Sequence, residues 1–300
     1  MFVRKFKCKA FSIMDKKFRF LVPVDFSEQS LIALDQAGNL ATRYNAELTI
    51  LYVIDEKKTK RFFINEKHLK EIRSKAETEI KNLVNSIKKT KHLEVKGLVL
   101  EGNVSETIID VAKNIQADLI AFGTEKKWGL KAQILGSKAL KIIKTSPAPI
   151  LTIKGKFHRH GCQTILLPLD LTKETTQKVQ NAINISKRFE GAEIQILSVI
   201  WTTNQKEVFA RLKAQMETVM EKISAEGVPC KGNIVKIIPE EDDFAETIVA
   251  FGEKINADLI LIMTQQEENP VEMFIGSSAV KVINLSKIPV ISFVPKSKQQ

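Results

Sequence analysis

Short apolar runs alternate with amphipathic stretches along the whole chain. The runs at 118–122 and 150–153 are continuous and rich in Ile and Leu, which is typical of parallel strands that helices cover on both faces. Between successive apolar runs elsewhere in the chain, apolar residues recur at helical spacing, as at Leu31, Leu34 and Ala37. Strands that alternate with helices predict a doubly wound parallel sheet, because each parallel crossover needs a helix and is right-handed.

The first half of the chain is expected to hold five strands and four helices. The strands are predicted at 17–24, 46–54, 93–100, 118–122 and 150–153. Ser27 and Ser137 stand where N-caps of helices are expected, and Asn45 marks a turn. Residues 55–64 read as a charged loop before a long helix that ends near Lys89.

The second half of the chain repeats the first. ADLIAFGT is matched by ADLILIMT, GSKALKIIKTSPAPILTI by GSSAVKVINLSKIPVISF, and the starts FLVPVD and AELTILYV by ILLPLD and AEIQILSV. The repetition predicts an α/β protein of two tandem Rossmann-like, doubly wound five-stranded parallel sheets. We expect a disordered leader at 1–15, repeat 1 at 16–154, a linker at 155–163, repeat 2 at 164–295 and a tail at 296–300.

Composition narrows the class of protein. The net charge of +11 comes from lysines scattered over amphipathic helices and tails, without the interleaved aromatics of a stacking platform, so specific nucleic-acid binding is not expected. No apolar run is long enough to span a bilayer, and the basic leader lacks the apolar core of a signal peptide, which favours a cytoplasmic protein. The linker sequence HRHGC (158–162) has no second ligand cluster, so we expect a solvated linker and no metal there.

Candidate chemistry gathers at the carboxyl ends of the predicted strands of repeat 1. Asp25 ends the first strand and Gly123 ends the fourth, and these strands are neighbours in a sheet wound outward from its first strand. Gly136 and Ser137 open a helix, where free N–H groups favour an anion and a glycine lets a ligand approach the backbone. The pattern predicts a nucleotide crevice with Asp25 on the nucleoside and the other three residues on the phosphates.

These residues carry a resemblance to a known family. The first motif is PVDFS at the end of the first strand. The second is Gly123 followed, after a spacer, by Gly136-Ser137, and then by a helix and an apolar strand. Together these motifs resemble those of the universal stress protein family. Its ATP-binding members have G-x2-G-x9-G-(S/T), of which Gly123, Gly136 and Ser137 match while Lys126 replaces the second glycine. The resemblance covers nearly the whole chain as two copies and implies a stress-response module that binds ATP or a related adenine nucleotide, with Mg²⁺ as the only accompanying metal.

The predicted nucleotide site lies in repeat 1. Lys126 crowds the site with its side chain, but its charge together with that of Lys127 favours a triphosphate, whereas Glu267 and Glu268 of repeat 2 oppose phosphates. The site residues are predicted to be Pro23, Val24, Asp25, Val53, Phe122, Gly123, Lys126, Gly136, Ser137 and Lys138.

Repeat 2 keeps only part of the motif. Met263 and Gln266 stand at the two early glycine positions, and Gly276 and Ser277 remain. A degenerate second site is predicted at Pro168, Asp170, Gly276, Ser277 and Ser278. In both repeats the alternative is a helix-start turn that binds nothing.

Partners and activity follow from the same pattern. The fifth strands (150–153 and 290–294) are apolar sheet edges that invite pairing, so we expect the two repeats to pair through them and the chain to form homodimers. The chain has no P-loop, no GxGxxG after the first strand and no G-x-S-x-G elbow, so we expect no enzyme, with slow ATP hydrolysis at most. Two alternatives stay open: a nucleotide-free scaffold that binds a protein or an apolar small molecule, and an enzyme that uses the same crevice.

Overall fold

The computed structural model describes residues 17–62, 65–124, 135–155, 161–171, 175–201, 206–238, 242–264 and 276–295. The leader and tail lie outside these ranges, as do Lys126, Lys127, His158, His160, Gln266, Glu267 and Glu268. Within the described ranges, no helix is both long and apolar enough to cross a membrane.

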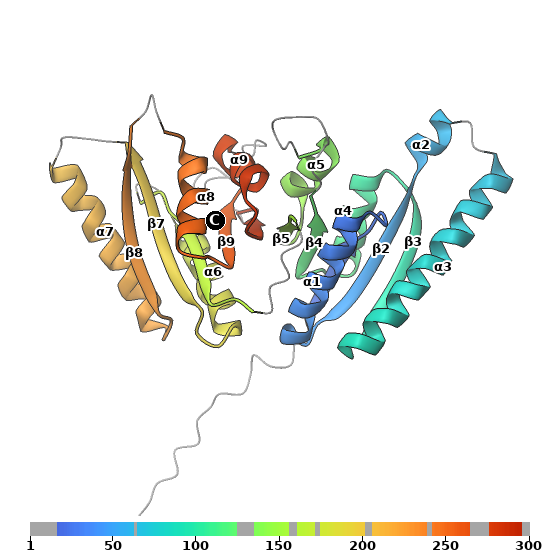
Figure 1. Cartoon of the computed structure of the whole chain (residues 1–300), viewed down its shortest axis with the longest axis horizontal. Coiled ribbons are helices and arrows are strands. Elements are labelled where there is room, and N and C mark those ends of the chain that lie inside the picture. The colour runs from blue at the N-terminus through green and yellow to red at the C-terminus, as the bar shows by residue number, and fades with distance from the viewer. Residues whose placement is uncertain are drawn as a thin grey trace, which may run out of the picture.

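The strands of the described ranges form one continuous ten-stranded sheet in the order β3-β2-β1-β4-β5-β10-β9-β6-β7-β8. Each half is the predicted five-stranded parallel sheet with its first strand in the middle, and Figure 1 shows the two halves side by side. The halves meet where β5 and β10 pair antiparallel, with Ile291 opposite Leu151. The strands are β1 Arg19–Pro23, β2 Glu47–Asp55, β3 Val95–Gly102, β4 Leu119–Gly123, β5 Ile150–Ile153, β6 Thr164–Pro168, β7 Glu193–Trp201, β8 Cys230–Ile237, β9 Leu259–Met263 and β10 Val290–Phe293.

Helices cover both faces of this sheet, as expected of parallel strands that are apolar on both sides. One core lies under α1 and α3 of repeat 1 and includes Leu34 and Ile80, and the other lies under α4 and α5 and includes Ile108 and Ile142. The longer helices are α1 Glu28–Tyr44, α3 Glu66–Lys91, α4 Val104–Asn114, α5 Ser137–Thr145, α6 Thr176–Arg188, α7 Lys206–Ala225, α8 Phe244–Lys254 and α9 Ser277–Leu285.

One predicted loop is a helix. Residues expected to form a charged loop include α2, Glu56–Arg61. Its sequence EKKTKR has no apolar stripe, so the hydrophobic pattern gave no sign of it. The helix packs beside the ends of β2 and β3.

Helix caps decide where the site-bearing helices begin. Ser27 caps α1 as predicted, because its hydroxyl accepts a hydrogen bond from the Ser30 N–H at 3.2 Å. Asn45 ends α1 in the left-handed conformation, with φ 47°. The prediction for Ser137 was wrong: Gly136 is the N-cap of α5, it makes no side-chain cap bond, and Ser137 is the first helical residue.

The repeated ADLI motif ties each fourth strand to its first. The Arg19 N–H donates to Asp118 Oδ2 at 3.1 Å, and in repeat 2 the Thr164 N–H donates to Asp258 Oδ2, also at 3.1 Å. Each aspartate therefore fixes the start of the central strand against its neighbour. In each repeat the carboxyl ends of the first and fourth strands therefore lie next to each other, at the opposite end of the strands from this aspartate.

Aromatic contacts join the repeats beside the strand pairing. The Arg188 guanidinium of repeat 2 lies over the Phe18 ring at 4.5 Å and over the Tyr44 ring at 5.5 Å. Phe189 meets Tyr44 edge-on, with ring centroids 6.2 Å apart. Burial in this contact raises the pKa of Tyr44 to about 12, although the charge of Arg188 acts in the opposite direction.

Candidate functional site

A cavity of about 590 Å³ lies at the carboxyl ends of β1, β2 and β4 in repeat 1. This is the position where ligands bind in open parallel sheets. Ser137 is not among its lining residues, and Lys126 lies outside the described residues. The other predicted site residues all line the cavity: Pro23, Val24, Asp25, Val53, Phe122, Gly123, Gly136 and Lys138.

The cavity also has lining residues that the sequence analysis missed. Asp55 follows the predicted Val53 by two residues on β2, so the alternation of a strand could have indicated it. Ser27 and Ser30 belong to the start of α1. Ser27 was predicted as the N-cap of this helix but not as a residue that lines the cavity. The remaining polar or contact residues that were missed include Tyr52, Thr124, Leu135, Lys154 and, from repeat 2, Ile283 and Asn284.

Asp25 is held as a carboxylate by the start of α1. Ser27 donates to Asp25 Oδ1 from its hydroxyl at 2.6 Å and from its backbone N–H at 3.1 Å. Partial burial acts to raise the pKa of Asp25, but the hydrogen bonds from Ser27 and Ser30 outweigh it, so the pKa lies below its usual value of 3.8. An ionised carboxylate at this edge is an acceptor for hydroxyl or amino donors of a ligand.

An aromatic pair stands beside this carboxylate. Phe26 has a positive φ of 62° and stacks on Tyr52, with ring centroids 4.8 Å apart. A non-glycine residue in the left-handed region costs free energy, and such residues concentrate at functional sites. Burial, and then the negative charge of Asp25, raises the pKa of Tyr52.

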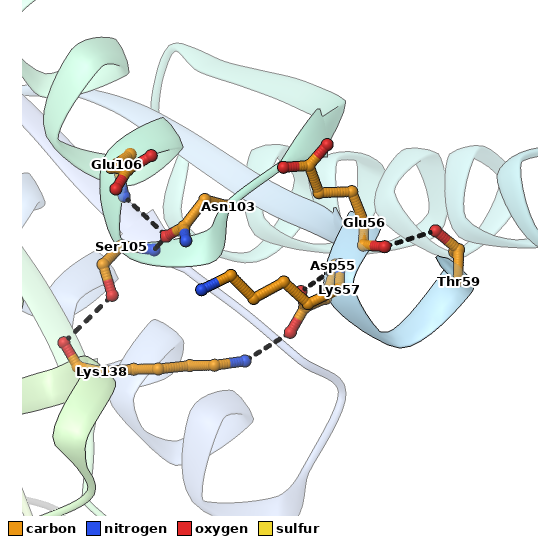
Figure 2. Close-up of polar contacts among 8 residues, drawn as sticks. All are labelled: Asp55, Glu56, Lys57, Thr59, Asn103, Ser105, Glu106 and Lys138. Carbon is orange, nitrogen blue, oxygen red and sulfur yellow. Dashed lines mark hydrogen bonds and ion pairs between the residues drawn. The ribbon is translucent and has the colours of Figure 1, made fainter. Parts of the chain in front are cut away.

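Lys138 crosses the side wall of the cavity. Its ammonium lies 2.5 Å from Asp55 Oδ2, and the Asp55 side chain is only 10% exposed. Ser105, in the first turn of α4, donates from its hydroxyl to the Lys138 carbonyl at 3.3 Å. Figure 2 shows the Lys138 side chain extending from the start of α5 to Asp55 at the end of β2, while its backbone carbonyl meets Ser105 of α4. The start of α5 is thereby fixed to both.

The two matching glycines of repeat 1 have different reasons to be glycine. A Cβ on Gly123 would lie 2.3 Å from the Gln29 carbonyl oxygen, so this glycine lets the start of α1 pack directly on the end of β4. A Cβ on Gly136 would meet nothing within 4 Å, and the backbone there (φ −61°, ψ 151°) suits any residue. Neither packing nor conformation therefore requires Gly136. It borders the cavity, where a side chain would take up space next to the first turn of α5.

The corresponding end of repeat 2 is built differently. Met263 replaces Gly123, and α6 begins eight residues after Pro168 (168 to 176), whereas α1 begins five residues after Pro23 (23 to 28).

Two polar groups at the predicted second site already have protein partners. Lys178 donates from its ammonium to the Pro168 carbonyl at 2.7 Å, and the Gly276 N–H donates to the Thr264 carbonyl at 2.9 Å. Ser277 and Ser278 are the first residues of α9, and Asp170 is exposed. Pro168 ends β6 and Asp170 follows it, while the Gly276 hydrogen bond joins the start of α9 to the residue after β9, the strand that pairs with β6.

Metal ligands do not gather in the part of the chain that the structure describes. Those ranges contain no group of three His, Cys, Asp or Glu side chains that could hold a metal ion. Cys162 is buried and Cys230 is half-buried, and both are thiols rather than members of a disulfide.

Known proteins resemble the chain in both sequence and structure. The family model of the universal stress protein family matches residues 18–154 and 161–293. Universal stress protein MJ0577 of Methanocaldococcus jannaschii is 33% identical over 161 residues, which cover 48% of this chain and 98% of that protein. Universal stress protein YxiE of Bacillus subtilis is 32% identical over 145 residues, covering 45% of this chain and 98% of its own length.

A solved structure resembles both halves together. The crystal structure of a universal stress protein from Archaeoglobus fulgidus superimposes with a TM-score of 0.71 at 22% identity, covering 91% of this chain and 97% of that one. Such a likeness supports the fold of the paired repeats. Since the family model matches each repeat over nearly its full length, the chain belongs to the universal stress protein family and carries two of its domains in tandem.

Proposed function

We propose that the chain is a cytoplasmic stress-response module that binds ATP or a related adenine nucleotide in repeat 1 and acts through partner proteins. The observation that carries the proposal is Gly136, a glycine with open space at its Cβ position that faces a cavity also lined by Asp25 and Lys138. A cavity of about 590 Å³ is within the range of small-molecule sites in proteins.

The lining residues fit the parts of a nucleotide. The first-turn N–H groups of α5 lack intrahelical partners and favour phosphate, and the missing side chain at Gly136 lets phosphates come close. Lys138 adds a positive charge on the same turn. Asp25 is ionised and suits ribose hydroxyls or a base amino group, and apolar residues such as Val53 and Phe122 suit the faces of a base. Mg²⁺ would enter with the nucleotide, bound mainly by its phosphates.

Repeat 2 has a supporting role in this proposal. Met263 stands at its strand end where repeat 1 has Gly123, and the sequence places the negative charges of Glu267 and Glu268 four and five residues later, so its crevice is less suited to phosphate. Binding is the proposed activity, and turnover of a separate substrate is not part of it. Since β5 and β10 pair with each other, homodimers of the chain would use another surface.

A nucleotide-free scaffold of the same fold is the second candidate. The observation in its favour is the Lys138–Asp55 ion pair. The Lys138 ammonium, which a phosphate would need as its counter-charge, already has a carboxylate partner. The cavity also has apolar walls, among them Leu51, Ile108 and Ile142, which suit an apolar small molecule.

Ligand released from the purified chain separates these candidates. Mass spectrometry of the denatured protein should detect adenine nucleotide from the unmodified chain and much less from Gly136→Asp or Asp25→Ala protein. Calorimetry with ATP and Mg²⁺ should then give binding to the unmodified chain. Absence of nucleotide in the first experiment and of binding at millimolar ATP in the second would reject the nucleotide proposal. Release of phosphate over many turnovers would instead favour an enzyme.

A further inference from the structure

Two residues of repeat 2, Ile283 and Asn284, line the cavity of repeat 1, and Asn284 makes polar contacts there. Asn284 lies in the last turn of α9, across the β5–β10 junction from repeat 1. The Leu135 N–H donates to Asn284 Oδ1 at 2.8 Å, and the Lys154 ammonium donates to the Asn284 carbonyl. All three residues line the cavity, so this contact belongs to its wall.

Both hydrogen bonds satisfy groups that need a partner. Leu135 is only 6% exposed, and a buried backbone N–H without an acceptor costs free energy. Carbonyl groups at the end of a helix lack intrahelical donors, and α9 has no basic residue in its own last turn. Lys154, at the end of β5, supplies the cation that the C-terminal end of a helix favours. The contact therefore joins the two repeats, because each donor of repeat 1 binds an acceptor of Asn284 in repeat 2.

The contact acts on the residue next to Gly136. Leu135 directly precedes the N-cap of α5, so the Asn284 side chain fixes the backbone that presents Gly136 to the cavity. Fixing a binding backbone in advance lowers the entropy that a ligand must remove.

The position of repeat 1 that corresponds to Asn284 carries a side chain of different chemistry. Asn284 follows Gly276 by eight residues, and the residue eight after Gly136 is Lys144. A lysine ammonium has three donors and no acceptor, so Lys144 cannot accept a hydrogen bond from a backbone N–H of repeat 2. The Lys144 side chain therefore cannot do for repeat 2 what the Asn284 side chain does for repeat 1.

We propose that Asn284 is a positioning residue through which repeat 2 holds the nucleotide cavity of repeat 1 in its binding conformation. Nucleotide affinity in repeat 1 then depends on the packing of α9 against it. This inference rests on the proposed function for the identity of the ligand, while the contact itself is measurable without any ligand.

Two measurements on the full chain test the proposal. Amide hydrogen exchange of Leu135, followed by NMR, reports the hydrogen bond, and calorimetry with ATP and Mg²⁺ reports its effect on binding. Asn284→Ala removes the acceptor, Asn284→Asp keeps an oxygen at the same place, and Lys144→Ala is the matched control in repeat 1. Loss of one hydrogen bond of ordinary strength predicts roughly five- to ten-fold faster exchange and roughly three- to ten-fold weaker ATP binding for Asn284→Ala.

The other variants make the result specific. Asn284→Asp should keep the slow exchange of Leu135, and Lys144→Ala should change neither readout. Unchanged exchange and unchanged affinity in Asn284→Ala would overturn this inference while leaving nucleotide binding intact, as would equal losses in Lys144→Ala. No ATP binding by the unmodified chain would reject the proposed function and the ligand part of the inference, whatever Leu135 exchange shows.

Discussion

The Lys138 ammonium and the Asp55 carboxylate lie 2.5 Å apart at the wall of the repeat 1 cavity. The Asp55 side chain is only 10% exposed, and the Lys138 side chain is 52% exposed. A phosphate that binds at the start of α5 therefore competes with Asp55 for the same cation. The ion pair holds α5 in place and at the same time limits how strongly Lys138 can attract a triphosphate.

Removing the charge of Asp55 should strengthen nucleotide binding. Asp55→Asn leaves Lys138 without its anionic partner, so we expect ATP to bind a few-fold more tightly. The size of the effect follows from the small free energy that a partly exposed ion pair contributes. Lys138→Gln should weaken binding. Calorimetry at low and moderate salt measures both effects, which screening should reduce. Weaker binding in both variants would mean that the pair acts only to hold the wall together.

The contribution of Asp25 to binding should not change between pH 5 and pH 8. Its pKa is lowered because hydrogen bonds from Ser27 and Ser30 outweigh the effect of burial. A carboxylate with a lowered pKa stays ionised above its ordinary value of 3.8, and its contribution is lost only as the pH falls through the lower folded-state value.

The matched variant for this test is Asp25→Asn. Loss of a charged hydrogen-bond acceptor should weaken ATP binding roughly ten- to a hundred-fold. The ratio of affinities between the unmodified chain and the variant should be constant over the pH series, because titration of the nucleotide itself cancels. A ratio that approaches one at pH 5 would contradict the lowered pKa.

Gly123→Ala should destabilise the fold. The new Cβ would lie 2.3 Å from the backbone oxygen of Gln29, and backbone moves less readily than the end of a side chain. Such overpacking costs about 1–3 kcal/mol in the free energy of unfolding. Urea unfolding followed by circular dichroism measures the change. Gly136→Ala, which meets nothing, is the control that should stay within about 0.5 kcal/mol.

Tyr44 should lose its phenolic proton at a higher pH than a free tyrosine does. Burial between the repeats raises its pKa to about 12 from 10.0, while Arg188 lowers it. The free energy of unfolding should therefore fall as the pH rises from 10 towards 12, because the unfolded chain loses this proton first. The chain has two tyrosines, so the ultraviolet absorbance of tyrosinate resolves them when Tyr52→Phe is compared.

Arg188→Ala supplies the second arm of that titration. Without the positive charge over the ring, the Tyr44 transition should move to still higher pH. An unchanged transition would show that the guanidinium does not sit over Tyr44 in solution.

Much of the fold follows from local pattern, and the residues show why. The apolar runs and the repeated ADLI and Gly-Ser motifs predicted both halves of the sheet, and the order of strands brought Asp25 next to Gly123. The first-strand motif also predicted the cap at Ser27, because the cap depends only on residues a few positions away.

What the sequence could not indicate depends on contacts between distant residues. Asn284 meets Leu135 across 149 positions, and no local periodicity reports such a pair. The two glycines of repeat 1 looked equivalent in sequence, yet Gly123 faces the Gln29 backbone and Gly136 faces open space. The helix Glu56–Arg61 was missed because it is short and fully polar.

The affinity of the chain for ATP, compared between Gly136→Ala and Gly276→Ala, tests the central claim most directly. The two substitutions are matched, since neither new Cβ would come closer than 4.0 Å to another atom, so the fold should tolerate both. Binding in repeat 1 predicts that Gly136→Ala loses most of the affinity while Gly276→Ala keeps that of the unmodified chain. Equal affinity in all three proteins, or loss in Gly276→Ala alone, would contradict the account.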